Sequence, residues 1–149
     1  MTSVADTRPG EPGDGSAGRR IPVVDYLQLE PEVRLRHQVC DACGACYWGR
    51  RNACSNCGGK SFHAADAPET GTLRSYTIVH RAAPGVPVPF VAAIVELADG
   101  TFVSANLRDV PPEPSVITLG QPVRLTTFVA GTDQEGTEAV AFGFTPVAM

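Results

Sequence analysis

Three features of the sequence predict a mostly β protein, in which an N-terminal rubredoxin-like zinc ribbon precedes a five-stranded Greek-key OB-fold barrel. Two C-x-x-C-G motifs lie 10 residues apart, five later segments are rich in β-branched residues, and no segment has a long helical period. A β-sandwich is the alternative arrangement of the same five strands. The 149 residues suffice for one ordinary domain and a small module that needs a metal to fold.

Changes in composition divide the chain into four parts. Residues 1–20 are rich in Gly, Pro, Ser and Asp, so we expect a disordered tail. Residues 21–36 form a lead-in segment, whose apolar positions fit either a short helix or an extended chain that ends near Pro31. Residues 37–66 form the four-cysteine ribbon, and residues 67–149 form the barrel.

The predicted metal ligands are four cysteines in two C-x-x-C-G turns. They are Cys40, Cys43, Cys54 and Cys57. Each turn lets two thiolates converge from one tight loop, and four thiolates complete the tetrahedron of one structural Zn²⁺. Iron is the alternative metal for this ligand set. Two disulfides are the other alternative, and they would need an oxidising compartment that no signal peptide supports.

Cys46 is the remaining cysteine. Because Cys40, Cys43 and Cys46 are each three residues apart, Cys46 could replace Cys43 as a metal ligand of the first turn. Gly44 follows Cys43 as Gly58 follows Cys57, whereas two bulky aromatic residues follow Cys46, so Cys43 is the predicted ligand. We expect Cys46 to be a small buried or half-buried thiol without the basic partner that a nucleophile needs. The three histidines are expected to be ordinary surface or strand residues: His37, His63 and His80.

The ribbon and the barrel each have a predicted set of strands. Residues 33–39 and 60–64 flank the two cysteine turns, and Tyr47, Trp48 and Phe62 are expected to cover the apolar surface of the ribbon. The five barrel segments are residues 71–80, 89–97, 101–107, 122–130 and 137–144. Asp99-Gly100 is a strong hairpin signal between the second and third of them.

Charge and motif content argue against several classes of function. Residues 67–149 carry four arginines and eight acids, a net charge of −4, which disfavours nucleic acid as a partner. No apolar run approaches 18 residues and no export signal precedes the chain, so we expect a cytoplasmic protein that does not cross a membrane. No motif of a hydrolase, nucleotide-binding or metalloprotease site occurs. Glu96 and His80, on central strands, are expected to lie at the rim or to face outward.

The order of a four-cysteine ribbon followed by the barrel resembles the zinc-ribbon OB-fold family known as domain of unknown function thirty-five. The resemblance covers about residues 33–147, and many members carry a longer helical segment before the ribbon. It is carried by the strand Ser75-Tyr76-Thr77-Ile78-Val79-His80, the turn Pro87-x-Pro89-Phe90-Val91 and the hairpin Glu96-Leu97-x-Asp99-Gly100.

This resemblance implies a non-catalytic accessory subunit. Proteins similar to this one bind and stabilise thiolase-like enzymes that act on acyl-CoA, including thiolases, acyltransferases and steroid side-chain aldolases, and help to shape the CoA and substrate channel. The partner would supply the catalytic residues, in an assembly with two copies of each subunit and acyl-CoA at the shared interface. Two alternatives are a single-stranded nucleic-acid-binding protein and a free-standing acyl-CoA binder with thioester chemistry at Cys46.

Overall fold

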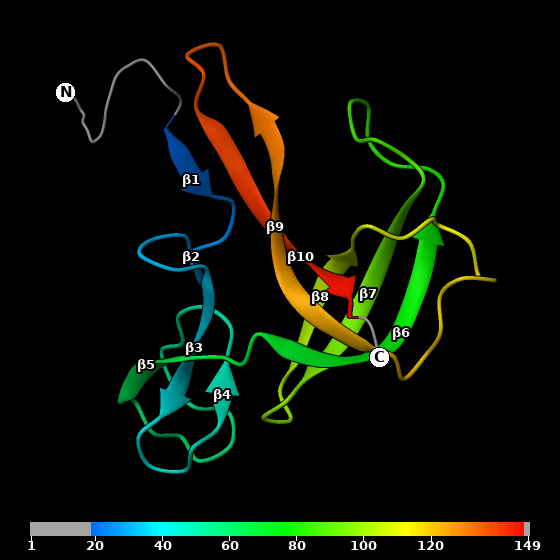
Figure 1. Ribbon diagram of the computed structural model, residues 1–149. Helices are drawn as coiled ribbons and strands as arrows, with labels where there is room; N and C mark the ends of the chain where they lie inside the picture. Colours follow the sequence, from blue (N-terminus) through cyan, green and yellow to red (C-terminus); the bar gives the residue numbers. More distant parts are fainter. Residues whose placement is uncertain (1–18, 148–149) are drawn as a thin grey trace.

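Ten β-strands form the framework of residues 19–147, the part of the chain that this computed structural model describes (Figure 1). No helix occurs in that range, and so none there has the length and apolarity to cross a membrane. The first four are β1 (Arg20–Pro22), β2 (Leu27–Gln28), β3 (Arg34–Cys40) and β4 (Cys46–Tyr47). The remaining six are β5 (Phe62–Asp66), β6 (Thr70–Val79), β7 (Phe90–Leu97), β8 (Phe102–Leu107), β9 (Pro122–Thr132) and β10 (Glu138–Pro146).

Five of these strands close into a barrel in the order β6, β7, β8, β10, β9 and back to β6. All neighbours are antiparallel except β8 and β10, which run parallel. This is the strand order of an OB-fold, with a long connection between β8 and β9. The predicted fold class is therefore confirmed, and the β-sandwich alternative is wrong.

Alternation of buried and half-buried residues explains how each strand contributes to the core. Along β7, every second side chain is buried, from Val91 to Leu97, and the intervening residues are half-buried. Ile94 on the outer face is half-buried, so this strand is also partly covered on the side away from the core.

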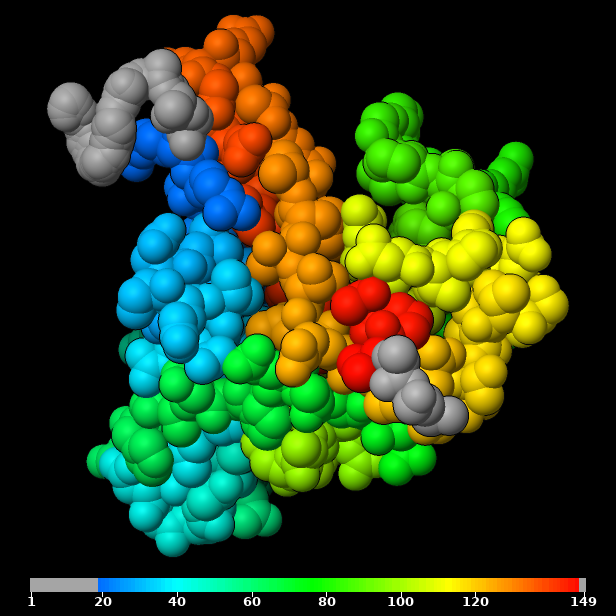
Figure 2. Space-filling view, viewed as in Figure 1, coloured from blue at the N-terminus to red at the C-terminus, as the bar shows by residue number. Residues whose placement is uncertain are grey.

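The lead-in segment is extended, which decides between the two conformations that its sequence permits. β1 pairs in parallel with β10, and β2 pairs with β3. Leu27 and Leu35 are 2% and 0% exposed and share one core with the barrel residues, so the ribbon region and the barrel are packed as one body. Figure 2 shows the lead-in lying against β9 and β10. The predicted disordered tail falls mainly on residues 1–18, which lie outside the described residues.

Closure of the barrel requires a glycine where β10 crosses β8. Gly143 pairs with Asn106, and a Cβ at position 143 would lie 2.6 Å from the Asn106 carbonyl oxygen and 2.8 Å from Cγ of Arg108. Neither the backbone oxygen nor the adjacent stem of Arg108 can withdraw far, because Arg108 N–H donates to the Phe144 carbonyl at 2.7 Å. The missing side chain therefore permits the only parallel contact in the closed barrel.

We predict that Gly143→Ala lowers the free energy of unfolding by about 1–3 kcal/mol, the usual cost of an extra methyl in a packed site. Urea denaturation followed by circular dichroism measures this change. Gly131→Ala in β9 is the matched control, because a Cβ there meets nothing within 4 Å, and it should change stability by less than about 1 kcal/mol. Equal effects of the two substitutions would contradict the steric account of closure.

Candidate metal centre and its surroundings

Two turns of the same geometry present the four cysteines. In the first, Gly44 N–H donates to the Cys40 carbonyl at 2.9 Å, and in the second, Gly58 N–H donates to the Cys54 carbonyl at 2.8 Å. Gly44 and Gly58 have φ angles of 81° and 78°, which a residue with a side chain adopts only with strain. The glycine argument from the sequence therefore identifies both turns, and strand β3 leads directly into the first one.

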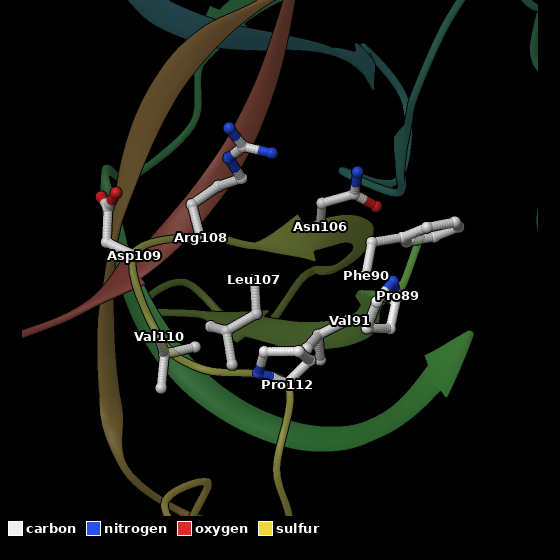
Figure 3. Close-up of a pocket in the computed structure, with 9 residues that line it drawn as sticks. All are labelled: Pro89, Phe90, Val91, Asn106, Leu107, Arg108, Asp109, Val110 and Pro112. Carbon is white, nitrogen blue, oxygen red and sulfur yellow. The ribbon is translucent and has the colours of Figure 1, made fainter. Parts of the chain in front are cut away.

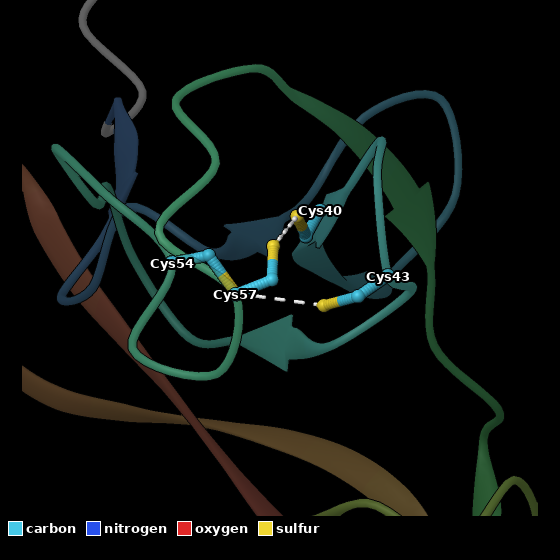
Figure 4. Close-up of side chains that lie close together, drawn as sticks. All are labelled: Cys40, Cys43, Cys54 and Cys57. Atoms are coloured by element: carbon cyan, nitrogen blue, oxygen red, sulfur yellow. Dashed lines mark hydrogen bonds between the residues drawn. The ribbon is translucent and has the colours of Figure 1, made fainter.

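The four sulfur atoms converge on one point between these turns (Figure 4). All lie within 4.8 Å of one another, and the sulfur atoms of Cys40 and Cys57, and those of Cys43 and Cys54, are 3.6 Å apart. A disulfide would require about 2.05 Å, so these are free thiols. Ligands about 2.3 Å from a tetrahedral zinc lie about 3.8 Å apart, and the cluster has that size. The four residues could therefore hold one tetrahedral metal ion.

The cysteines of the cluster differ in pKa because their thiols have different hydrogen-bond partners. The hydrogen bond from Tyr47 is the largest cause, and together with two backbone amides and the Cys43 sulfur it outweighs the effect of burial and lowers the pKa of Cys54 to about 6. The Gly59 amide also favours the thiolate of Cys57, but contacts with the Cys40 and Cys43 sulfurs and burial outweigh it and raise the pKa of Cys57 to about 12. Four thiolates at these distances repel one another, and a bound dication would relieve that repulsion.

Hydrogen-bond donors from this chain reach the sulfur cluster, among them a side-chain amide, a backbone N–H and a phenol. Asn56 donates its side-chain amide to the Cys43 sulfur at 3.3 Å, and Gly59 N–H lies 3.4 Å from the Cys57 sulfur. The Tyr47 hydroxyl lies 3.3 Å from the Cys54 sulfur. The spacing of the cysteines could not reveal these donors, although the position of Tyr47 just after the first turn placed it near the ribbon's apolar surface.

Cys46 lies outside the cluster, and the expectation that it is buried or half-buried is wrong. It begins β4 with an exposed side chain, and its sulfur lies 3.6 Å from the Gly44 carbonyl. Partial burial of the sulfur, followed by the charge of Asp99, raises the pKa of the Cys46 thiol. A thiol held protonated in this way is a weak nucleophile, which disfavours thioester chemistry at this position.

His37 is the only buried polar or charged residue within residues 19–147, at 4% exposed. It lies on strand β3, as one of the two expected settings for this histidine, and it is buried where the other setting was the surface. Its Nε2 lies 3.3 Å from a carboxylate oxygen of Asp99 in the β7–β8 hairpin, whereas its Nδ1 has no partner. Since the two residues are 62 positions apart, the local sequence could not indicate this contact. His37 joins the ribbon to the barrel and does not touch the sulfur cluster.

Trp48 adds a second contact between the ribbon and the barrel. Its indole N–H donates to the Phe102 carbonyl at 2.8 Å, and its ring lies 5.3 Å from the Tyr26 ring and 5.4 Å from that of His37. Tyr47 and Phe62, by contrast, pack on each other within the ribbon, with ring centroids 6.1 Å apart. Trp48 therefore lies in the contact between the ribbon and the barrel, which we call the junction. It does not cover a separate apolar surface of the ribbon, as the sequence led us to expect.

The other residues that could take part in acid–base chemistry lie apart from one another. Glu96 accepts a hydrogen bond from Arg74 at 2.7 Å, and its side chain is 31% exposed. His80 is exposed, and His63 is exposed and hydrogen-bonded to Asp41. These positions agree with the outward orientation expected for Glu96 and His80, and they bring no base next to a nucleophile.

A pocket of about 140 Å³ opens where β7 begins and β8 ends (Figure 3). In that view Leu107 and Val110 point to one side of the chain and Arg108 to the other, where its guanidinium lies 3.8 Å above the Phe128 ring. Small-molecule sites usually measure about 300–1,000 Å³, so this pocket is too small to enclose a large ligand by itself. The nine lining residues include no histidine, cysteine or serine.

Comparison with known proteins identifies relatives of this chain. A family model described as the C-terminal OB-fold domain of ChsH2 matches residues 64–128. A probable enoyl-CoA hydratase alpha subunit of Thermomonospora curvata is 34% identical over 101 residues, which are 67% of this chain and 31% of that protein. A DUF35 domain-containing scaffold protein of Methanocaldococcus jannaschii is 31% identical over 77 residues, which are 50% of this chain and 55% of that protein. The chain thus spans about a third to about half of these curated relatives.

A solved structure of similar fold covers most of the chain. The structure of the Ltp2-ChsH2(DUF35) aldolase includes a chain that matches with a TM-score of 0.63 and 32% sequence identity. The match covers 77% of this chain and 86% of that chain. The similarity therefore extends over more of this sequence than the 65-residue barrel segment that the family model matches.

The contact of Asp99 with His37 is predicted to make the stability of the protein depend on pH. Partial burial alone would raise the pKa of Asp99, but the hydrogen bonds from Thr101 and His37 outweigh burial and lower it. Because the folded pKa lies below the unfolded value of about 4, the carboxylate stabilises the fold fully above that value. This contribution is lost as the pH falls through the folded pKa.

We predict that Asp99→Asn lowers stability at pH 7 by about 1 kcal/mol and reduces the loss of stability below about pH 4. Urea denaturation at a series of pH values measures both effects. Asp109→Asn is the control, since it removes an exposed carboxylate of the barrel. If the stability of Asp99→Asn falls as steeply below about pH 4 as that of the unmodified protein, the Asp99 carboxylate does not stabilise the junction as we propose.

Proposed function

This chain belongs to the DUF35 family, and we propose that it is a non-catalytic accessory subunit of an enzyme that acts on acyl-CoA substrates. The observation that carries the proposal is the 32% identity across 86% of a chain in the Ltp2-ChsH2(DUF35) aldolase structure. The names of the two curated relatives, an enoyl-CoA hydratase subunit and a scaffold protein, support the same class of role.

The partner in this proposal is a thiolase-fold enzyme, such as a thiolase, an acyltransferase or a steroid side-chain aldolase. Two copies of this chain would bind a dimer of the partner, stabilise it and help to shape its CoA and substrate channel. The protonated thiol of Cys46, the separation of His80 from Glu96 and the small pocket support a partner that supplies the catalytic residues.

One structural Zn²⁺ is the proposed cofactor, with Cys40, Cys43, Cys54 and Cys57 as its ligands. The support is the size of the sulfur cluster and the softness of four thiolates, which favours zinc over the hard cations. When bound, the ion would cross-link the two turns and leave no open coordination position for a substrate.

A nucleic-acid-binding ribbon and barrel has weaker support. The net charge of residues 67–149 is −4. Of the two arginines at the tip of the ribbon, Arg50 bonds to Asn52 at 2.9 Å and Arg51 lies 4.4 Å above the Tyr47 ring. Both guanidinium groups thus have partners within the ribbon, where a phosphate-binding face would present them to the ligand.

We predict that alanine at any one of the four clustered cysteines removes the metal and unfolds the ribbon. The apparent folding free energy supplied by a structural zinc is on the order of 10 kcal/mol, far more than so small a module can replace. Elemental analysis of the purified variants and near-ultraviolet circular dichroism measure the two effects. Cys46→Ala is the control and should keep one zinc per chain. Loss of zinc from Cys46→Ala but not from Cys43→Ala would contradict the ligand assignment.

We predict that the purified protein binds a thiolase-like enzyme from the same cell with equal numbers of the two subunits. Isothermal titration calorimetry against each such enzyme measures the affinity and the ratio. A single-stranded oligonucleotide titrated at low and high salt is the comparison, and it should show no binding with a steep salt dependence. Absence of heat with every thiolase-like candidate, together with salt-dependent oligonucleotide binding, would favour the alternative function.

A further inference from the structure

The hydroxyl group of Tyr47, a residue that follows the first cysteine turn in the sequence, contacts the second turn. Its oxygen is 3.3 Å from the Cys54 sulfur and 2.9 Å from Oγ of Ser55. The backbone N–H of Ser55 donates to the same oxygen at 3.1 Å. Tyr47 follows the first turn in sequence, on β4, whereas Cys54 and Ser55 open the second turn. The phenol therefore connects the two halves of the candidate metal centre.

Counting donors assigns the direction of these hydrogen bonds. A phenol oxygen accepts two hydrogen bonds and donates one. The Ser55 backbone N–H can only donate, and the Ser55 hydroxyl can donate the second bond, which leaves the phenol hydrogen for the Cys54 sulfur. A thiolate accepts hydrogen bonds and has none to give, so this arrangement satisfies every group when Cys54 binds a metal.

The ring of Tyr47 is held in place from three sides. The Arg51 guanidinium lies 4.4 Å from the ring centroid on one face, and the Phe62 ring meets it edge to face at an interplanar angle of 78°. The backbone of Tyr47 pairs with Gln38 of β3, the strand that ends at the first ligand. The hydroxyl is thus preorganised and needs little ordering to reach the sulfur.

The opposite half of the centre has a matching donor. Asn56, from the second turn, donates to the sulfur of Cys43 in the first turn at 3.3 Å, while Tyr47, beside the first turn, points to Cys54 in the second. The second turn therefore supplies a donor to a sulfur of the first, and β4, which follows the first turn, supplies a donor to a sulfur of the second. Four thiolates around Zn²⁺ would carry a net charge of −2, and donors of this kind would stabilise that charge.

We propose that Tyr47 is an outer-sphere positioning residue of the metal centre, and that its hydroxyl holds the Cys54 thiolate and slows the loss of metal. Ser55 directs the phenol hydrogen, and Arg51 holds the ring. The inference rests on the proposed metal site. Loss of an outer-sphere hydrogen bond typically costs 10- to 100-fold in metal affinity, which sets the scale of the effect.

The test compares the full-length protein with Tyr47→Phe, Ser55→Ala and, as a control, Tyr76→Phe, which removes the same atom from β6 of the barrel. Each protein is loaded with Zn²⁺, and the rate of metal transfer to a chelator is measured. Each is also loaded with Co²⁺, and the sulfur-to-cobalt charge-transfer band is recorded. The band reports electron density on the sulfurs, which a purely structural role of the ring would not change.

We expect about tenfold faster metal transfer from Tyr47→Phe, a smaller increase from Ser55→Ala, and no change in Tyr76→Phe. The charge-transfer band of Tyr47→Phe should move to lower energy, because the sulfur loses a hydrogen bond. If Tyr47→Phe fails to fold, Ser55→Ala, which keeps the ring, decides by the same two readouts. A band and a rate equal to those of the unmodified protein overturn the inference. Absence of Co²⁺ binding by the unmodified protein would instead overturn the proposed metal site.

Discussion

The convergence of four cysteine sulfurs within 4.8 Å is the constraint on which the ribbon depends. As thiolates they would repel one another, and a bound cation could balance that repulsion in a ribbon that has few apolar residues with which to stabilise itself otherwise. Two turns of equal geometry bring the sulfurs together, and donors from the second turn and from β4 reach two of them. The ribbon is therefore arranged around a sulfur cluster that could hold a metal ion, whereas the barrel is arranged around a conventional apolar core.

The ribbon and the barrel nevertheless behave as one structural unit. Leu27 and Leu35 enter the barrel core, Trp48 bonds to the backbone of Phe102, and His37 meets Asp99 in the β7–β8 hairpin. Folding of the ribbon thus fixes one side of the barrel. A rigid module of this kind suits a subunit whose role is to hold a partner enzyme in shape, since little conformational freedom remains to be lost on binding.

Local patterns in the sequence predict most of this architecture. The glycines after Cys43 and Cys57 identify the two turns, and the five β-branched segments predict the barrel strands to within a few residues. Nonlocal contacts account for what the sequence leaves open or predicts wrongly. The lead-in is extended because β1 finds an edge of β10, more than 100 residues later. His37 is buried because Asp99 lies opposite, and the donors to the sulfurs emerge only once the turns are folded.

Native mass spectrometry of the complex isolated from its own cells tests the central claim, a metal-held module that serves a catalytic partner, most directly. The account predicts an assembly with two copies of this chain of 15.7 kDa and two of a thiolase-fold enzyme, and one zinc ion for each copy of this chain. A free 15.7 kDa chain without metal, or one bound only to nucleic acid, would contradict it.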